Sequence, residues 1–219
     1  MELKGKKINF LGDSITEGCS VSVPEHYFWN VIGREQGATV RGYGIGGTRI
    51  ARQKNPTVAN PRQDLDFCMR VDEMDPDADI IVVFGGTNDW GHGDAPLGTP
   101  ADRTPDTFYG ACHTLCRKLI EKYPSAVIAF MTPLHRETED DLRGGQRKPA
   151  DVGNLLTYVR IIREVTEEYS LPTLDLYACS GMQPKIKAHK ELYMPDGLHP
   201  NDAGHAVIAR KLTNFLLTL

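Results

Sequence analysis

Three residues with complementary chemistry lie near opposite ends of the chain. Ser14 follows a short apolar run in "NFLGDSITEG", and Asp196 and His199 lie in "DGLHP". A serine hydroxyl is a weak nucleophile until a base removes its proton, and a histidine base needs a carboxylate to orient it. Three-residue spacing on a tight turn can bring the Asp196 carboxylate to His199 Nδ1 while Nε2 faces Ser14. The pattern predicts Ser14, Asp196 and His199 as catalytic residues.

A serine nucleophile also requires hydrogen-bond donors for the oxyanion of the tetrahedral intermediate. The N–H of Ser14, the N–H of Gly47 and the side-chain amide of Asn88 are candidates from three separate segments. Gly46 is an alternative donor because it adjoins Gly47. For Asn88 the competing interpretation is that it braces a turn, and for Ser14 that it caps a helix. Asp89 is expected to have a structural role.

Alternating strand-like and helical patterns indicate how these residues are positioned. Five apolar runs of strand length are bounded by Gly, Pro or polar residues, at 7–11, 39–43, 79–86, 126–133 and 172–178. Segments with helical periodicity fall between or after them, at 25–36, 62–73, 105–122, 151–169 and 201–218.

The pattern of elements predicts an α/β fold. The runs "IIVVF" and "VIAFM" are continuously apolar, as expected of strands buried on both faces of a parallel sheet. Right-handed crossovers then give a three-layer α/β/α sandwich with a five-stranded parallel sheet. Ligands bind at the carboxyl ends of the strands in such sheets. We therefore expect "GDS", "GYGIGG", "GGTND" and "DGLHP" to meet at that edge.

These four segments together resemble the SGNH hydrolases, also called the GDSL lipase/acylhydrolase family. "FLGDSITEG" is similar to the first family block, with Ser14 as nucleophile, and "GIGGTRI" to the second, with Gly47 as oxyanion donor. "GGTND" is similar to the third block, with Asn88, and "DGLHP" to the fifth, with Asp196 and His199. The blocks occur in the right order over residues 7 to 205. The second block departs from the pattern, because two glycines adjoin where Asn or Ser neighbours are usual.

The resemblance implies a flavodoxin-like sheet, no metal and no organic cofactor. It also implies hydrolysis of carboxylic esters through an acyl-enzyme, commonly of acetyl or other short acyl groups on carbohydrates or lipids. The expected partner is therefore a small-molecule ester. A non-catalytic binding module on the same fold is an alternative, because a complete triad shows capacity rather than use.

A dinucleotide-binding protein is a further alternative, because "GYGIGG" at 42–47 satisfies G-x-G-x-x-G. The expected acidic residue about 20 positions later has no strand ahead of it, and no helix clearly begins at the glycines. An ordinary α/β-hydrolase is disfavoured because the chain contains no G-x-S-x-G elbow.

Length and composition set the remaining expectations. A chain of 219 residues fits one domain, 1–219, and a net charge of −4 spread along it gives no reason to expect a nucleic-acid partner. Neither a signal-peptide core nor a membrane-spanning run is present, which predicts a cytoplasmic protein without membrane contact. The five scattered cysteines suit reduced thiols, and Cys112 and Cys116 of "CHTLC" suit a buried helix face better than zinc.

Two long loops, 90–105 and 134–149, follow strands and are expected to determine the substrate. Trp90 and His92 could line the substrate pocket or cover the underside of their loop. His135 is expected at the surface, as is the basic stretch "LRGGQRKP" at 142–149, which is flanked by acidic residues. His205 is expected to be packed or solvated.

Overall fold

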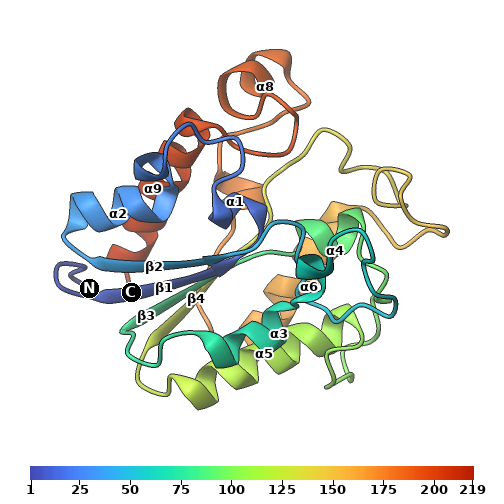
Figure 1. The fold of residues 1–219 in the computed structure, drawn as a ribbon, viewed down its shortest axis with the longest axis horizontal. Helices are drawn as coiled ribbons and strands as arrows, with labels where there is room; N and C mark the ends of the chain where they lie inside the picture. The colour runs from blue at the N-terminus through green and yellow to red at the C-terminus, as the bar shows by residue number, and fades with distance from the viewer.

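The computed structural model describes residues 1–219 as a parallel sheet covered by helices on both faces (Figure 1). Its strands are β1 (Lys7–Gly12), β2 (Thr39–Gly44), β3 (Ile80–Phe84), β4 (Val127–Met131) and β5 (Thr173–Leu174). They lie in the order β2-β1-β3-β4-β5, and every neighbouring pair is parallel. This is the flavodoxin-like strand order, so the predicted three-layer α/β/α fold is confirmed.

Nine α-helices accompany the sheet. They are α1 (Ser14–Glu17), α2 (Phe28–Gln36), α3 (Phe67–Arg70), α4 (Thr87–Gly91), α5 (Phe108–Lys122), α6 (Leu155–Glu168), α7 (Leu176–Cys179), α8 (Lys187–Tyr193) and α9 (Asp202–Leu217). Helices α2 and α9 cover one face of the sheet, and α3, α5 and α6 cover the other (Figure 1).

The continuously apolar run of β3 is explained by burial on both faces. Ile80, Val82 and Phe84 pack into the cluster formed with α2 and α9. Ile81 and Val83 point the other way, into the cluster formed with α3, α5 and α6. Because successive side chains of a strand alternate between faces, a strand covered on both sides has no polar positions.

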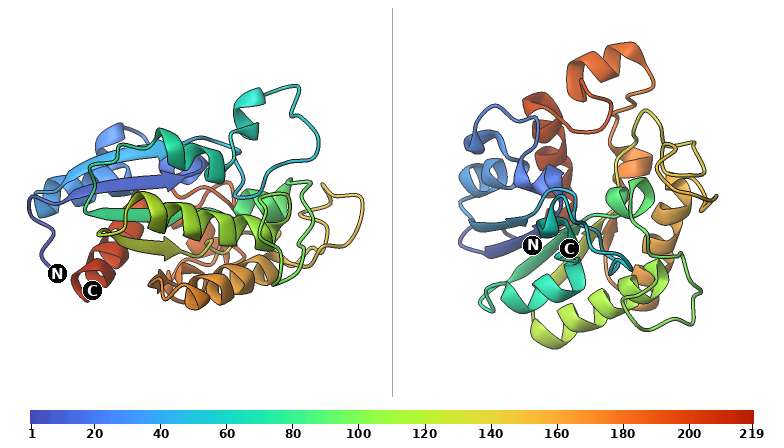
Figure 2. Two further views of the ribbon diagram at one scale, coloured as in Figure 1. Left: turned by 90° about the horizontal axis from the view of Figure 1, so that it is seen from below. Right: turned by 45° about the vertical axis from the view of Figure 1, so that its right-hand side comes forward.

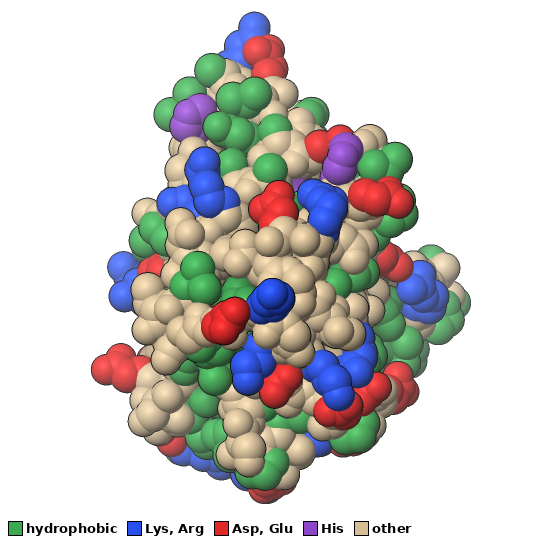
Figure 3. Space-filling model, turned by 90° about the vertical axis from the view of Figure 1, so that its left-hand side faces the viewer, with side chains coloured by type: hydrophobic (Ala, Val, Ile, Leu, Met, Phe, Trp, Pro, Cys, Tyr) green, Lys and Arg blue, Asp and Glu red, His purple; other side chains and the backbone are tan.

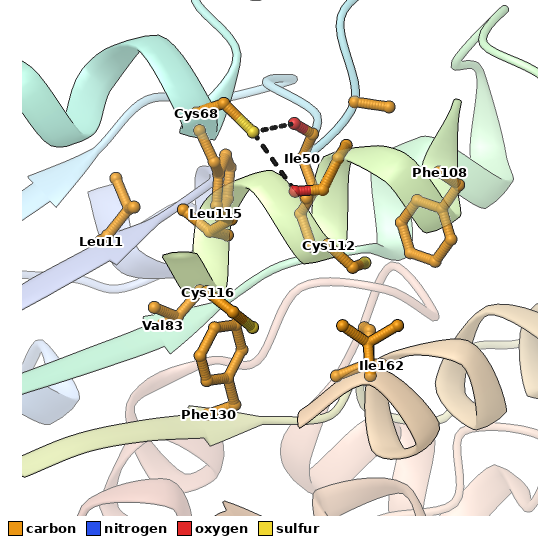
Figure 4. Close-up of a cluster of buried hydrophobic side chains, with 14 of the residues drawn as sticks. Leu11, Ile50, Cys68, Val83, Phe108, Cys112, Leu115, Cys116, Phe130 and Ile162 are labelled. Carbon is orange, nitrogen blue, oxygen red and sulfur yellow. Dashed lines mark hydrogen bonds between the residues drawn. The ribbon is translucent and has the colours of Figure 1, made fainter. Parts of the chain in front are cut away.

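Helix α5 contributes small and sulfur-containing side chains to the second cluster. Cys112, Leu115 and Cys116 belong to this cluster together with Val83 of β3 and Phe130 of β4, and Cys116 lies next to Phe130 (Figure 4). The two cysteines are 4% and 0% exposed. Burial raises the pKa of the Cys116 thiol to about 12. The predicted buried helix face is confirmed.

Two of the predicted elements were wrong in extent. The strand expected at 172–178 pairs only through Thr173 and Leu174, because Asp175 accepts a hydrogen bond from Ala178 N–H at 3.1 Å and begins α7. The helix expected at 62–73 is a short α3 between two 3₁₀ turns, Pro61–Asp64 and Val71–Glu73. Helices α1, α4, α7 and α8 were not predicted, since elements of four to seven residues are too short to show a clear period.

The two termini lie side by side at the amino ends of the strands (Figure 2). The amino group of Met1 donates a hydrogen bond to the carbonyl oxygen of Leu217 at 2.8 Å. Side chains of both charge signs are interspersed on this side of the molecule (Figure 3). None of the helices combines the length and the apolar character needed to cross a membrane.

Candidate active site

Ser14 lies at the carboxyl end of β1, where the chain turns directly into α1. A Cβ atom on Gly12 would lie 2.0 Å from Thr16 Oγ1, so the helix can fold back on the strand only because residue 12 is glycine. Asp13 caps α1 by accepting a hydrogen bond from Ile15 N–H at 3.0 Å. The cap is therefore Asp13, and the hydroxyl of Ser14 is free for another partner.

That partner is His199, which is 185 positions away in the sequence. Ser14 Oγ lies 3.0 Å from His199 Nε2, and His199 Nδ1 lies 2.7 Å from Asp196 Oδ2. The structure thus brings the three predicted catalytic side chains into one hydrogen-bonded chain. The side chain of His199 is 22% exposed and that of Asp196 is 48% exposed, so this pair reaches the surface.

The turn before α9 holds the carboxylate of Asp196 in place. Asp196 Oδ1 accepts the N–H groups of Leu198 and His199 at 2.8 and 2.7 Å, and Gly197 adopts a φ of +77°. Partial burial would raise the pKa of Asp196, but the hydrogen bonds from the His199 side chain and from the two N–H groups outweigh it and lower the pKa. Asp196 is therefore ionised and oriented toward the imidazole.

The two glycines after β2 differ in whether their N–H groups are available. Gly46 donates its N–H to Glu17 Oε2 at 2.7 Å, whereas the N–H of Gly47 donates to no other atom of the chain. A Cβ on Gly46 would lie 3.6 Å from Ser14 Cβ, which places this loop against the nucleophile. Of the two candidates, Gly47 is the one with a free donor.

Asn88 and Asp89, at the carboxyl end of β3, hold the loop after β2. One Nδ2 hydrogen of Asn88 is donated to Thr48 O at 3.0 Å, which leaves the second for a ligand. The carboxylate of Asp89 accepts the N–H groups of Ile50 and Ala51, both at 2.9 Å. Burial raises the pKa of Asp89 to about 6 in spite of these bonds. Asn88 therefore braces the loop and keeps a free donor as well, while Asp89 has the structural role predicted for it.

The buried guanidinium of Arg70 connects the ends of β1 and β2 with the loop that follows β2. Arg70 of α3 is 3% exposed and donates to Tyr43 O at 2.7 Å, Gly12 O at 3.0 Å and Thr48 Oγ1 at 2.9 Å. Burial lowers its pKa to about 10. Nothing in the sequence around Arg70 indicates this role, because its partners come from two distant segments, one with Gly12 and the other with Tyr43 and Thr48.

The loop 134–149 is packed against α4. Trp90 is 0% exposed and belongs to the core, so it covers the underside of its loop instead of lining a pocket. Lys148, expected at the surface, is 7% exposed, and its Nζ donates to Asp89 O at 2.5 Å and to Tyr158 Oη at 3.0 Å. The prediction of a solvated basic loop is wrong at this residue, which anchors the loop to the segment that carries Asn88.

The other histidines have separate roles. His92 Nδ1 lies 3.3 Å from Arg49 Nη1, and burial followed by the charge of Arg49 lowers the pKa of His92 to about 4. His135 is paired with Glu139 at 2.8 Å and stacks on Tyr177. His205 is fully buried and accepts the N–H of Phe28 at 3.0 Å, so it is packed.

The glycine-rich segment 42–47 is not followed by the helix that a dinucleotide-binding site requires. Gly42 and Gly44 lie within β2, and no helix begins at Gly47. The strand–turn–helix unit that would bind a pyrophosphate is therefore absent from this segment.

Comparisons with known proteins agree with this geometry. The model of the GDSL-like lipase/acylhydrolase family matches residues 10–207. A protein from Lactobacillus plantarum with a solved crystal structure is 31% identical in sequence to this chain, with 98% of each chain covered and a TM-score of 0.84. A GDSL-like lipase from Bacteroides ovatus is 19% identical over 99% of this chain and 100% of its own, with a TM-score of 0.70.

A more distant match is a two-domain esterase active on acetylated mannans. It is 20% identical, with 98% of this chain and 49% of its own covered, and the TM-score is 0.60. A search of curated protein sequences found no match.

The buried carboxylate of Asp13 should make stability depend on pH. Burial raises its pKa from 3.8 to about 6, so the folded chain binds the proton more tightly than the unfolded chain and the fold gains stability as pH falls from about 7 to 4. Asp13→Asn keeps an oxygen for Ile15 N–H and removes the charge. We expect the variant to exceed the wild type in unfolding free energy at pH 8 by up to about 3 kcal/mol, and the difference to vanish near pH 4.

Urea unfolding at both pH values measures this difference. Asp151→Asn is the control, because that side chain is 70% exposed and its replacement should change stability by less than about 0.5 kcal/mol. An Asp13→Asn protein less stable than the wild type at pH 8 would contradict the expectation.

Proposed function

Since the chain belongs to the GDSL-like lipase/acylhydrolase family, it is an ester-hydrolysing enzyme, and we propose that Ser14, His199 and Asp196 carry the reaction. The observation that carries this proposal is the pair of hydrogen bonds from Ser14 Oγ to His199 Nε2 at 3.0 Å and from His199 Nδ1 to Asp196 Oδ2 at 2.7 Å. A nucleophile in contact with a base that a carboxylate orients is the arrangement needed for acyl transfer.

In the first half of the reaction, Ser14 Oγ attacks the ester carbonyl carbon while its proton passes to His199 Nε2. The carbonyl π electrons move to oxygen and form a tetrahedral oxyanion. The intermediate collapses by expelling the alcohol, which takes the proton from His199. An acyl group then remains on Ser14, and Asp196 stabilises the transient imidazolium.

The oxyanion is bound by the N–H groups of Ser14 and Gly47 and by Nδ2 of Asn88. Ser14 opens α1, where first-turn N–H groups have no partner within the helix. The free N–H of Gly47 and the second Nδ2 hydrogen of Asn88 support the same assignment. Donors that are free before substrate binds can stabilise the developing charge without reorganisation.

In the second half, His199 removes a proton from water, and the resulting oxygen nucleophile attacks the acyl carbon. Collapse of the second tetrahedral intermediate returns the proton to Ser14 Oγ and releases the carboxylic acid. The enzyme is regenerated with His199 neutral.

The surroundings of the site favour a short acyl group on a polar alcohol. Trp90 is fully buried and thus offers no apolar wall, while Arg136 lies over its ring and His92 faces Arg49. Polar side chains of this kind around the site suit a carbohydrate better than a lipid tail. The distant match to an esterase active on acetylated mannans makes acetylated sugars a sensible first set of substrates.

Replacing the nucleophile gives the most direct test. Ser14→Ala should reduce hydrolysis of p-nitrophenyl acetate by about 10³-fold or more, because no other side chain can form the acyl-enzyme. Ser125→Ala, at an exposed serine, is the control and should retain full activity. A fluorophosphonate should label Ser14 in the wild type and in the control. Equal turnover by Ser14→Ala would overturn the proposal, and a wild type that binds an ester ligand but does not hydrolyse it would favour a binding module.

The oxyanion assignment predicts a loss confined to catalysis. Asn88→Ala should lower kcat by about 10²- to 10³-fold with little change in KM, since the donor acts mainly in the transition state. Asn60→Ala, at an exposed side chain without a capping hydrogen bond, is the matched control. Thermal unfolding checks that loss of the bond to Thr48 O has not unfolded the loop. A normal kcat in Asn88→Ala would remove Asn88 from the oxyanion site.

Acyl-chain length tests the substrate class. A buried methylene contributes about 0.8 kcal/mol, and a polar rim supplies no such burial, so kcat/KM should fall from p-nitrophenyl acetate to butyrate and octanoate. Acetate release from acetylated monosaccharides should be measured in parallel. A kcat/KM that rises through octanoate would indicate an apolar acyl site and a lipid substrate.

A further inference from the structure

Arg136 is a buried cation to which the reaction just described assigns no part. It follows β4 at the carboxyl edge of the sheet and is 5% exposed. Its guanidinium carbon lies 4.7 Å above the ring of Trp90, and Nη1 lies 3.1 Å from Thr87 Oγ1 and 3.3 Å from Thr87 O. Arg136 therefore packs on both ends of α4, the helix that carries Asn88.

Most donors of this guanidinium remain free. Only Nη1 donates to the protein, and Nη2 and Nε are absent from the buried polar atoms that lack a partner. These two nitrogens therefore reach the solvent-accessible surface although the residue as a whole is buried. By contrast, Arg70, buried to a similar extent, donates from all three nitrogens to protein oxygens.

The neighbouring carboxylates are already bound to other groups. Glu137 pairs with Lys190 at 2.7 Å, and Glu139 binds His135 and the Nζ of Lys185. Glu139 contacts Arg136 only through the backbone of Arg136: its carboxylate accepts the N–H of Arg136 at 3.0 Å, and its own N–H donates to the carbonyl oxygen of Arg136 at 3.3 Å. The guanidinium itself has no ion-pair partner, which is a costly arrangement for a buried charge.

The segment that contains Arg136 lies against the turn of Asp196 and His199, because the N–H of Glu137 donates to Gly197 O at 2.9 Å. Burial, followed by the charge of Arg147, lowers the pKa of Arg136 to about 10, although the carboxylates of Asp13, Asp196 and Glu139 act to raise it. Asp13 adjoins the nucleophile, and Asp196 binds the base. Arg136 therefore contacts α4, which carries Asn88, and its neighbour in the chain contacts the turn that carries His199.

We propose that Arg136 binds a carboxylate of the substrate, so that the enzyme prefers esters that carry a carboxylate near the ester bond. The proposal rests on the proposed function. A guanidinium presents parallel N–H donors that match a carboxylate, and two such bonds fix orientation as well as charge. Stacking on Trp90 and the bond to Thr87 hold the plane of the donor group before substrate arrives. Arg136 would thereby act as a specificity-determining residue.

The test uses two pairs of substrates that differ only in charge. The carboxylate is on the alcohol side in 4-acetoxybenzoate, with 4-acetoxybenzamide as its neutral match. It is on the acyl side in 4-nitrophenyl hydrogen glutarate, with the methyl ester of that compound as its match. For each pair, the ratio of kcat/KM for the charged to the neutral ester is divided by the ratio of their rates with hydroxide.

We expect this corrected ratio to exceed 1 by about 10-fold or more for one of the two pairs in the wild type, which also identifies the side that carries the carboxylate. Arg136→Gln should reduce it by about 10- to 100-fold, mainly through KM for the charged ester. Arg143→Gln removes one charge from an exposed position of the same loop and should leave the ratio unchanged. Arg136→Lys should fall between the wild type and Arg136→Gln, because it keeps the charge but loses the paired donors.

A wild-type ratio near 1 for both pairs overturns the proposal, and so does a high ratio that survives in Arg136→Gln. If Arg136→Gln does not fold, the decision passes to Arg136→Lys and to product inhibition of the wild type. The wild type should then bind 4-hydroxybenzoate at least about 10-fold more tightly than 4-hydroxybenzamide, or glutarate at least about 10-fold more tightly than monomethyl glutarate. Hydrolysis of p-nitrophenyl acetate that depends on Ser14, without any charge preference, would reject this inference and leave the proposed function intact.

Discussion

The 3.0 Å contact between Ser14 Oγ and His199 Nε2 depends on the geometry of the parallel sheet. One partner is placed by the end of β1 and the other by the turn that enters α9, so neither segment can form the contact alone. Both turns are tight because they contain glycines, Gly12 beneath α1 and Gly197 between the carboxylate and the imidazole. The buried sheet therefore fixes the distance between Ser14 Oγ and His199 Nε2, because the short turns leave the two side chains little freedom to move.

Charged side chains, most of them buried, supply hydrogen bonds to the backbone of the loops around the site. The segments that follow β1, β2 and β3 form neither a helix nor a sheet along most of their length, so many backbone groups need other partners. The carboxylates of Asp13, Glu17 and Asp89 accept backbone N–H groups, and Arg70 donates to carbonyl oxygens. Because Glu17 binds Gly46 N–H and leaves that of Gly47 free, this scaffold also selects which donors remain available to a ligand.

Much of the fold and the proposed catalytic residues could be predicted from local patterns, because each motif lies at a strand end and parallel strands bring such ends together. The choice between Gly46 and Gly47 could not, since it depends on Glu17 reaching across from α1. The role of Arg136 was equally hidden, because its burial results from the loop after β4 folding over Trp90. Short helices such as α8, whose seven residues include no buried side chain, lack the apolar stripe that periodicity detects.

The contact between Met1 and Leu217 places the two termini next to each other. They lie at the amino ends of the strands, opposite the edge of the sheet where β1 ends before Ser14 (Figure 1). A covalent link between these ends would need to span only a few residues, and the polypeptide could then be opened in an exposed loop instead. Such a circular permutation would preserve the strand order and the loops at the carboxyl edge. The fold should therefore tolerate it far better than a shift in the pairing register of a strand. The same placement means that a segment attached at either end would extend from the side opposite the catalytic groups.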